Sequence, residues 1–382
     1  MDAVHDCCAG LDIHKRTVVA CVRRLGPAGE VHQDVRSFGT MTDELQALSD
    51  WLASNAVAQV AMESTGVYWK PIFNLLEARF PVVLVNAQHI KQVPGRKTDV
   101  KDCQWIAQLL QYGLLRASFI PPLPIRELRD LTRQRTQLIR ERVSVSNRVE
   151  KVLEDANIKL ASVATEVLGK SGRAMIRALI GGETDEARMA EMAQSRLRAK
   201  IPQLRRALRG QVTDHHRYQL RAPMEHVAHL EGLIEQIGDR VALAMAPYAS
   251  QLERLMTIPG VNRQAAEAIV AEVGVDMSRF PTAGHLCSWA GVAPGNNESA
   301  GRRRSGRTNE ANRWLRPILV QVAWAASHTK ATLLSATYRR WAKRIGKKRA
   351  LVGLAHKVLK IVYEVLKGGA TYEERLEPEP VA

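Results

Sequence analysis

The sequence predicts an α/β N-terminal domain, a helical coiled-coil middle and a mainly α-helical C-terminal domain. Three observations carry this prediction. β-rich and helical runs alternate over the first third of the chain, a long stretch free of glycine and proline follows, and a compact helical pattern resumes from residue 251. At 382 residues the chain also exceeds what one hydrophobic core usually organises, which favours several domains.

The first third alternates strand and helix signals in a fixed order. Strands are expected at 8–14, 17–24, 31–38, 59–63 and 81–86, and helices at 43–52, 68–78 and 99–112. Three strands, helix, strand, helix, strand, helix is the order of the ribonuclease H-like fold. Pro121, Pro122 and Pro124 then mark the exit from this domain, because proline cannot join a helix interior.

Two long helical stretches follow the prolines. Residues 126–159 contain no glycine or proline and predict one long exposed helix. Apolar residues then recur from Leu220 to Met245 in steps of three and four, a near-heptad pattern. Both an antiparallel helical hairpin within one chain and a coiled-coil dimer interface fit this pattern, and the sequence leaves the two interpretations open.

The last third returns to helix around one loop. Residues 256–274 predict two helices joined by a Pro-Gly turn, a shape whose turn amides can hold a phosphate. The glycine-rich, basic run 290–307 predicts a loop, and 311–330 and 331–365 predict helix. The expected division is a metal-binding domain at 1–120, a helical region at 125–250, a C-terminal domain at 251–368, and a disordered acidic tail at 369–382.

The charge distribution predicts a polyanionic partner. The net charge is +16, and between Arg302 and Lys360 there are sixteen basic residues and the single acid Glu310. Such clustering favours nucleic acid, because cations that neutralise phosphates release condensed counterions. The residues expected to bind nucleic acid are Arg302, Arg303, Arg304, Arg307, Arg313, Arg316, Lys347, Lys348 and Arg349.

Several classes of protein are excluded. The longest apolar runs are far too short to cross a bilayer, so no membrane partner is expected. The start of the chain has no basic-then-apolar leader, which favours a cytoplasmic location. The five cysteines form no CxxC pair, and no histidines stand at zinc-ligand spacing, which argues against a structural zinc site.

Four acidic residues predict a metal site in the first third. Asp12 lies in the first strand and Glu63 closes the fourth, and these strands are neighbours in a ribonuclease H-like sheet. Asp99 and Asp102 stand three apart, on one face of the last helix. Alone, Asp99 also fits a helix N-terminal charge and Asp102 a solvated residue. Clustered carboxylates need cations, and oxygen-only ligands suit Mg²⁺, for which Mn²⁺ can substitute.

Two serines stand among arginines in the predicted loop. Ser299 and Ser305 flank Arg302, Arg303 and Arg304, whose planar guanidinium groups grip phosphate oxygens in pairs. A serine hydroxyl becomes a nucleophile only when its proton is removed and the phosphate charge is screened. The residues alone favour a phosphate hydrogen-bond donor over a nucleophile, and they offer no obvious general base.

Four motifs, taken in order, carry a family resemblance. They are GLDIHK around Asp12, MESTGVYW around Glu63, NAQHIKQVPGRKTDVKDCQWIAQLL around Asp99 and Asp102, and ESAGRRRSGRTNEANRWLR from Glu298. Over roughly 8–116 and 254–328 the chain resembles the DEDD transposases of insertion sequences, recombinases described as guided by a bridge (seeker) RNA.

This resemblance implies a RuvC-like N-terminal domain whose acids Asp12, Glu63, Asp99 and Asp102 bind Mg²⁺. It implies a C-terminal transposase domain with a nucleophilic serine, matched by Ser299 in SAGRRR, with Ser305 as the fallback. The implied reaction is attack of the serine on a DNA phosphate, followed by exchange of strands between donor and target DNA. The resemblance also implies a guide RNA. A homo-oligomer, dimer or tetramer, is implied because the family's active site is composite.

Two other functions fit parts of the sequence. A metal-dependent Holliday-junction resolvase-like nuclease would use the same acids with water as the nucleophile. A non-catalytic nucleic-acid-binding protein would explain the basic segment but not four intact acids. A covalent protein–DNA intermediate separates the transposase from both.

Overall fold

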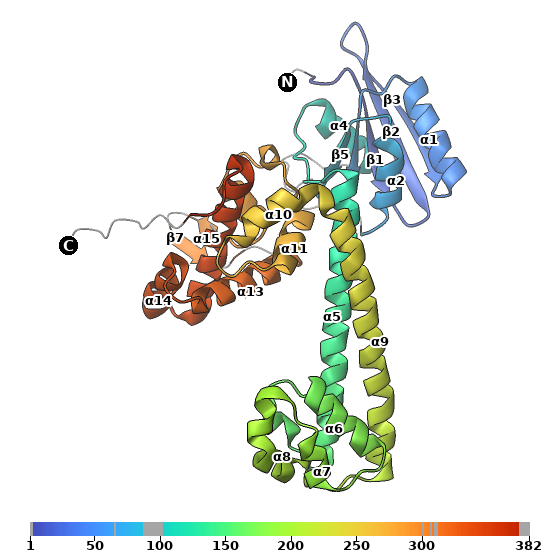
Figure 1. Ribbon diagram of the computed structural model, residues 1–382. Helices are drawn as coiled ribbons and strands as arrows, with labels where there is room; N and C mark the ends of the chain where they lie inside the picture. The colour runs from blue at the N-terminus through green and yellow to red at the C-terminus, as the bar shows by residue number, and fades with distance from the viewer. Residues whose placement is uncertain are drawn as a thin grey trace, which may run out of the picture. The chain divides into compact units, whose positions relative to one another are not determined.

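The computed structural model describes residues 3–64, 66–86, 102–295, 297–299, 302–305, 308 and 312–373. The chain divides into two compact units, Met1–Ile120 and Pro121–Ala382. The first unit is α/β and the second is almost entirely helical, which confirms the predicted α/β start and helical remainder (Figure 1). None of the helices in the described ranges is long and apolar enough to cross a membrane.

A mixed five-stranded sheet forms the centre of the first unit, with strand order β3-β2-β1-β4-β5. The strands are β1 (Cys7–Ile13), β2 (Thr17–Leu25), β3 (Val31–Gly39), β4 (Gln59–Glu63) and β5 (Val82–Val85). The first three strands pair antiparallel, as consecutive strands joined by short turns do. β4 and β5 continue the sheet parallel to β1, because a helix separates each of them from the strand before it.

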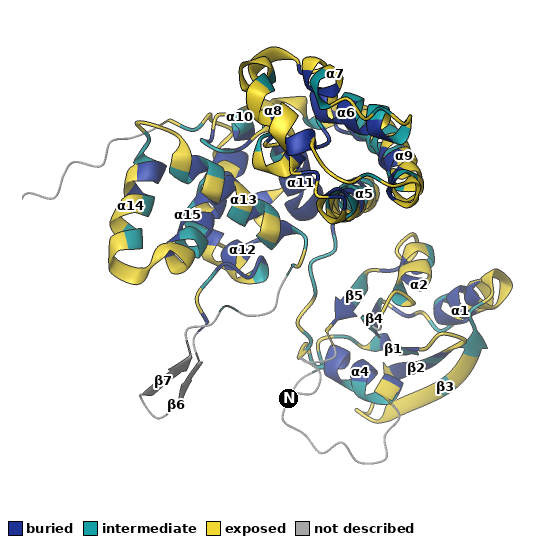
Figure 2. Cartoon of the chain, turned by 90° about the horizontal axis from the view of Figure 1, so that it is seen from below, coloured by how far each residue is buried: buried dark blue, intermediate teal, exposed yellow. Residues whose placement is uncertain are grey.

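Helices cover both faces of this sheet. They are α1 (Thr42–Ser54) and α2 (Trp69–Leu76) on one face and α4 (Asp102–Gln111) on the other, as Figure 2 shows. Because strand side chains alternate between faces, Leu11 packs in the α1–α2 core while Cys8 packs with Ile106 of α4. The two faces of β1 therefore serve two different cores.

Two long helices, α5 (Leu123–Asp155) and α9 (Asp214–Ala244), pack against each other in the second unit (Figure 1). They belong to one chain, so the near-heptad pattern forms an intramolecular helical hairpin. Leu220 and Val227 are buried in the core shared with α5. The long helix begins earlier than predicted: Pro124 lies in its first turn, where a missing N–H costs no hydrogen bond.

A small helical body closes the far end of this hairpin. It consists of α6 (Lys170–Ile180), α7 (Glu186–Glu191) and α8 (Ile201–Leu208), with short 3-10 turns between them. Its buried residues Met175, Ile176 and Leu204 join the core of the hairpin. The body is therefore an extension of the hairpin core.

The rest of the unit packs around one central helix. The helices are α10 (Ala249–Met256), α11 (Arg263–Val273), α12 (Ala283–Trp289), α13 (Leu315–His328), α14 (Leu333–Ile345) and α15 (Lys347–Gly368). Leu354, Val358 and Val362 of α15 are fully buried among them. The predicted run 331–365 is not one helix, because Gly346 adopts φ +84° and separates α14 from α15.

The prediction of a loop over 290–307 is wrong in part. β6 (Asn297–Ser299) and β7 (Arg302–Ser305) pair antiparallel. The pairing uses backbone N–H and C=O groups, which every residue carries. The two strands, NES and RRRS, contain no apolar residue and so have no period-two hydrophobic pattern from which the hairpin could be predicted.

Candidate functional site

The sheet brings two of the predicted carboxylates to neighbouring positions. Parallel pairing of β1 with β4 sets Leu11 beside Met62. Asp12 and Glu63, the next residue on each strand, therefore occupy neighbouring positions. Glu63 is in turn paired with Val85 of β5. The side chain of Asp12 is 18% exposed, and its Oδ2 lies 3.2 Å from Nε2 of His14. Two acids that are 51 positions apart in sequence thus lie at the carboxyl ends of two neighbouring strands.

Alternation along the strands places both carboxylates on the face covered by α4. Gly10 and Ala61 lie two residues before Asp12 and Glu63, and Ala61 belongs to the α4 core. Gly10 is required for this packing, because a Cβ there would lie 2.3 Å from the backbone atoms Cys103 O and Ala107 N. The first turn of α4 is thereby held against the strand that carries Asp12.

Asp102 is the first residue of α4, and its side chain is exposed. Asp99 lies outside the described residues. Within the described ranges, no three His, Cys, Asp or Glu side chains stand close enough to hold a metal ion. The structure brings together Asp12 and Glu63 and sets the helix of Asp102 on the same face. Carboxylate oxygens are the donors that a hard divalent cation takes.

The predicted nucleophiles lie on the β6–β7 hairpin. Ser299 is paired with Arg302, and Ser305 is paired with Asn297. Ser299 is the last residue of β6, whereas Ser305 ends β7 at the other end of the ladder. Arg303 and Arg304 share β7, while the side chains of this hairpin and Arg307 lie outside the described atoms. The hairpin backbone thus holds Ser299 directly opposite an arginine.

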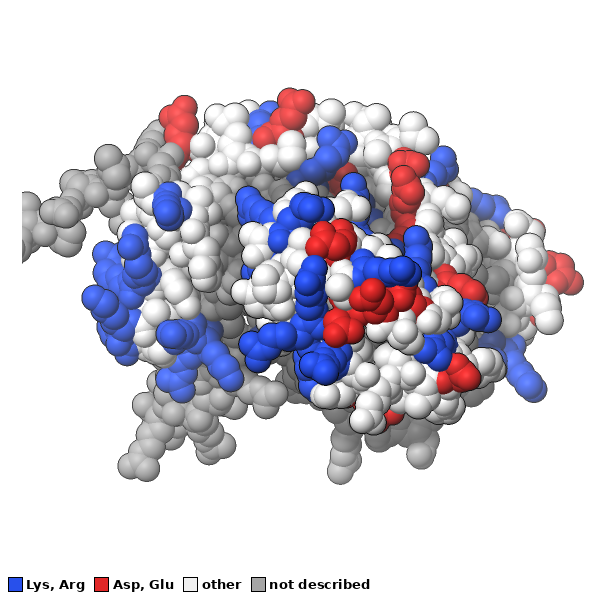
Figure 3. Space-filling model, turned by 60° about the horizontal axis from the view of Figure 1, so that its bottom comes forward, with Lys and Arg blue, Asp and Glu red and all other residues white. Residues whose placement is uncertain are grey.

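The predicted basic residues divide between two parts of the second unit. Arg313 and Arg316 border the start of α13, and Lys347, Lys348 and Arg349 form the exposed first turn of α15. The exposed Arg339, Arg340, Lys343 and Arg344 of α14 continue this second group. Figure 3 shows Lys and Arg side chains gathered in the region of α14 and α15. No Asp or Glu occurs between residues 311 and 363, so α13, α14 and most of α15 contribute only positive charge to this surface.

Two protein-family models match the parts of the chain that hold these residues. A family model of the DEDD transposases of IS110 type, described as "Transposase", matches residues 9–158, a range that holds all four predicted acids. A second, described as "Transposase IS116/IS110/IS902 family", matches residues 252–339, which hold Ser299 and the arginine run. The two ranges together span more than half of the chain.

The chain belongs to the IS110 family of DEDD transposases. A curated relative is the "Insertion element IS110 uncharacterized 43.6 kDa protein" of Streptomyces coelicolor, which is 33% identical over 126 residues. This match covers 32% of the present chain and 30% of the relative. The chain therefore spans less than a third of the length of the curated relative that it matches.

In this IS110-family protein, sequence reasoning missed a buried charge network between α5 and α11. Glu272 of α11 is 1% exposed. Arg133 donates to its Oε1 and Oε2 at 2.7 and 2.9 Å, and Asn312 Nδ2 donates to Oε2 at 2.7 Å. Asn312 Oδ1 in turn accepts from the N–H groups of Trp314 and Leu315 and caps the start of α13. The network holds the segment that follows β7 against the long helix.

The only signal for this network in the sequence is the density of arginines in α5. A solvated helix face shows the same pattern, so the pattern cannot identify which arginines are buried. Burial lowers the pKa of Arg129 to about 10, and Glu272 lies 3.5 Å from its Nε. Arg129 still keeps its charge at neutral pH, because that value is far above 7.

Two cysteines of the sheet are buried thiols. Burial raises the pKa of both Cys8 and Cys21 to about 12, so these thiols stay protonated at neutral pH. Thiolates are the form that attacks phosphorus or binds a metal. Neither residue therefore competes with the carboxylates for a cation.

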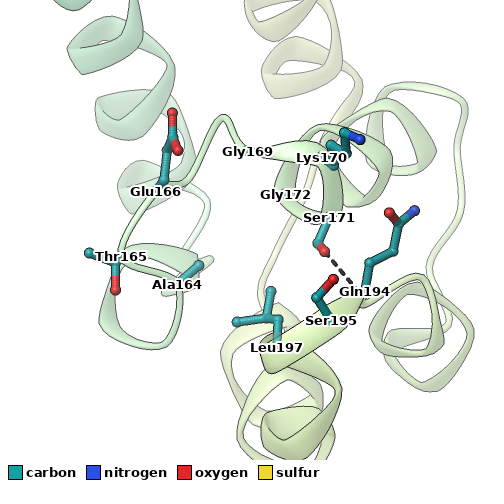
Figure 4. Close-up of a pocket in the computed structure, with 10 residues that line it drawn as sticks. All are labelled: Ala164, Thr165, Glu166, Gly169, Lys170, Ser171, Gly172, Gln194, Ser195 and Leu197. Carbon is teal, nitrogen blue, oxygen red and sulfur yellow. Dashed lines mark hydrogen bonds between the residues drawn. The ribbon is translucent and has the colours of Figure 1, made fainter.

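The small helical body at the end of the hairpin holds a cavity of about 230 Å³ (Figure 4). Ser171 Oγ accepts a hydrogen bond from Gln194 N at 2.9 Å beside it. Glu166 and Lys170, which carry opposite charges, both line the cavity. It contains none of the predicted site residues, and its mixed charge does not favour a polyanion.

Proposed function

We propose that this protein cuts and rejoins DNA at the ends of an insertion sequence, using Ser299 as the nucleophile and divalent cations held by Asp12, Glu63, Asp99 and Asp102. The observation that supports this most directly is the parallel register that sets Asp12 beside Glu63 on the α4 face. Membership of the IS110 transposase family supports the DNA substrate.

The first unit fits a ribonuclease H-like, RuvC-like domain. Its strand order, with three antiparallel strands followed by two parallel ones, agrees with the order expected for that fold. In this arrangement the first and fourth strands are central neighbours, and they carry Asp12 and Glu63. The second unit then comprises a helical hairpin region and a C-terminal transposase domain.

The reaction that fits these residues is transfer of a phosphoryl group to serine. Ser299 Oγ forms a bond to phosphorus, the bond from phosphorus to the 3′-oxygen breaks, and the proton lost by serine balances the one gained by the free 3′-hydroxyl. Arg302, Arg303 and Arg304 hold the non-bridging phosphate oxygens and screen their charge from the approaching hydroxyl. Asp12, Glu63, Asp99 and Asp102 would hold the divalent cation, which would supply Lewis-acid stabilisation of the developing charge.

A structured guide RNA and a homo-oligomer belong to the same proposal, and both rest on the family resemblance. Arginines that contact the sugar-phosphate backbone position a nucleic acid without reading its sequence. Base pairing with an RNA would supply the specificity that such contacts lack.

One reconstituted reaction tests the proposed function. The protein is purified without nuclease treatment, any bound RNA is sequenced, and DNA carrying an element end and its target is added with Mg²⁺. We expect joined DNA products that disappear when the RNA is degraded and, separately, when the cation is chelated. Cleaved ends that are never joined, with no adduct on the protein, would identify a nuclease that uses water.

Neutralising the hairpin arginines should weaken DNA binding and flatten its dependence on salt. The plot of log K against log salt has a negative slope. In Arg302→Gln/Arg303→Gln/Arg304→Gln, each lost phosphate contact should make this slope less negative by about 0.9. Fluorescence anisotropy over a salt series measures this slope. Lys347→Gln/Lys348→Gln/Arg349→Gln removes the same charge from α15, so an equal flattening of the slope in both variants would indicate that both surfaces contact DNA. An unchanged slope in the hairpin variant alone would remove these arginines from the interface.

A further inference from the structure

A cavity of about 290 Å³ lies within the second unit, between α5, α11 and α13. Its walls are mostly apolar and include Ile139, Ala268, Pro317, Ile318 and Val322. The polar side chains of the lining are Arg135, Thr136, Arg140, Asn262, Gln264 and Gln321. Apolar walls with a few polar groups are the usual composition of a small-molecule site, and such sites have volumes of about 300–1,000 Å³.

Three guanidinium groups lie close to the ring of Trp314, which lines this cavity. The Cζ atoms of Arg133, Arg140 and Arg313 lie 5.4, 5.4 and 5.6 Å from the centre of the Trp314 ring. Arg133 is neutralised by Glu272. Arg140 and Arg313 are exposed, and no carboxylate in the described ranges lies within ion-pair distance of either. The cavity therefore carries uncompensated positive charge beside an indole.

The cavity is built on rigid packing. Arg135, which lines it, is bound to the buried Glu267 at 2.8 Å, and both side chains are less than 10% exposed. Gly260, at φ +88°, brings the α10–α11 turn against α13, where a Cβ would lie 2.5 Å from Val322 O. No larger residue fits there. The space is thus held open by backbone contact and a buried ion pair.

We infer that this cavity binds one unpaired nucleotide of the nucleic acid. The apolar walls and Trp314 suit the faces of a base, since bases stack on aromatic side chains and on guanidinium planes. The amides of Gln264 and Gln321 each offer a donor and an acceptor, the pair that reads the edge of a base. Arg140 at the rim suits the attached phosphate.

The volume excludes a duplex. A cavity near the lower end of the usual range cannot admit a base pair together with its two backbones, so the nucleotide must be unpaired or turned out of its helix. Trp314 lies nine residues after the end of β7, and Asn312 between them donates a hydrogen bond to Glu272. The captured nucleotide would thus belong to the strand handled by the hairpin.

This inference rests on the proposed function for the identity of the ligand as nucleic acid. Its test uses the full chain and two short single strands of one sequence, one DNA and one RNA, each with a fluorescent purine analogue whose emission falls on stacking. Ala265→Phe fills the cavity from α11, and Gln321→Leu removes one amide and leaves an apolar side chain in its place. Ala242→Phe, at an exposed position of α9 outside the cavity, is the matched control.

We expect the wild type and Ala242→Phe to quench the analogue, and Ala265→Phe to abolish quenching and weaken binding about tenfold, the effect of losing one stacked base. Gln321→Leu, which changes an exposed residue and should not impair folding, should weaken binding several-fold. Quenching by only the DNA or only the RNA strand identifies the source of the nucleotide. Unaltered quenching in both cavity variants overturns the inference and leaves the proposed function standing. Failure of the wild type to bind or quench either strand also overturns the inference, whereas the proposed function stands or falls with the joined DNA products of the reconstituted reaction.

Discussion

Ser299→Ala should abolish recombination while leaving the binding of DNA and RNA intact. The substitution removes one hydroxyl from β6 and leaves the backbone pairing with Arg302 unchanged. Because the proposed nucleophile is then missing, joined products should fall on the order of 10⁶-fold, the loss that removing a covalent nucleophile produces. A denaturing gel of the wild type with labelled DNA should show a protein–DNA adduct that the variant lacks.

Ser305→Ala is the matched control for this experiment. Ser305 carries the same hydroxyl on the same hairpin, but it is paired with Asn297 at the other end of the ladder. We expect this variant to keep both the adduct and the joined products. If Ser305→Ala loses the adduct and Ser299→Ala keeps it, the nucleophile is Ser305. If both variants remain fully active, the covalent serine mechanism is wrong.

Asp12→Asn should abolish strand cleavage and the response of the protein to Mg²⁺. The amide keeps the shape of the side chain but removes the negative charge that attracts the cation. Losing several kcal/mol of charge stabilisation in the transition state corresponds to a factor of about 10³ or more in rate. Calorimetric titration of the free protein with Mg²⁺ measures binding directly, and a cleavage assay measures the rate.

A control variant and an unfolding measurement distinguish loss of the cation from loss of the fold in Asp12→Asn. Asp43→Asn alters an exposed acid in the first turn of α1, on the opposite face of the sheet, and should preserve both cation binding and cleavage. The thermal unfolding midpoint of Asp12→Asn should match the wild type, because the half-buried carboxylate contacts only the largely exposed His14 among the ion pairs of the described residues. Undiminished cleavage by Asp12→Asn would place the cation site elsewhere.

Much of the first unit could be predicted from the sequence, because its strands and helices have strong local patterns. The strands Cys7–Ile13, Gln59–Glu63 and Val82–Val85 begin and end within about one residue of the predicted bounds. The proximity of Asp12 and Glu63 was also predictable once the strand order was assumed. The register between β1 and β4, which makes these two residues neighbours, joins distant parts of the chain and is known only from the structure.

Other features had no local signal. The hairpin of β6 and β7 carries polar and basic residues on both sides, so its composition is that of a loop. The break at Gly346 depends on one positive φ angle in an otherwise helical run. Pro124 was expected to lie outside the helix, yet the first turn of α5 accepts it.

By itself, the sequence determined the family, the alternation of strands and helices, the clustering of positive charge, and the residue types available for chemistry. Each of these depends on composition or on neighbours a few positions apart. Only the tertiary structure decided that α5 and α9 form a hairpin within one chain, that Glu272 binds an arginine 139 positions away, and that Trp314 borders a cavity. The physical reason is that burial, ion pairing and cavities are set by packing between segments distant in the chain, and no local pattern records which segments meet.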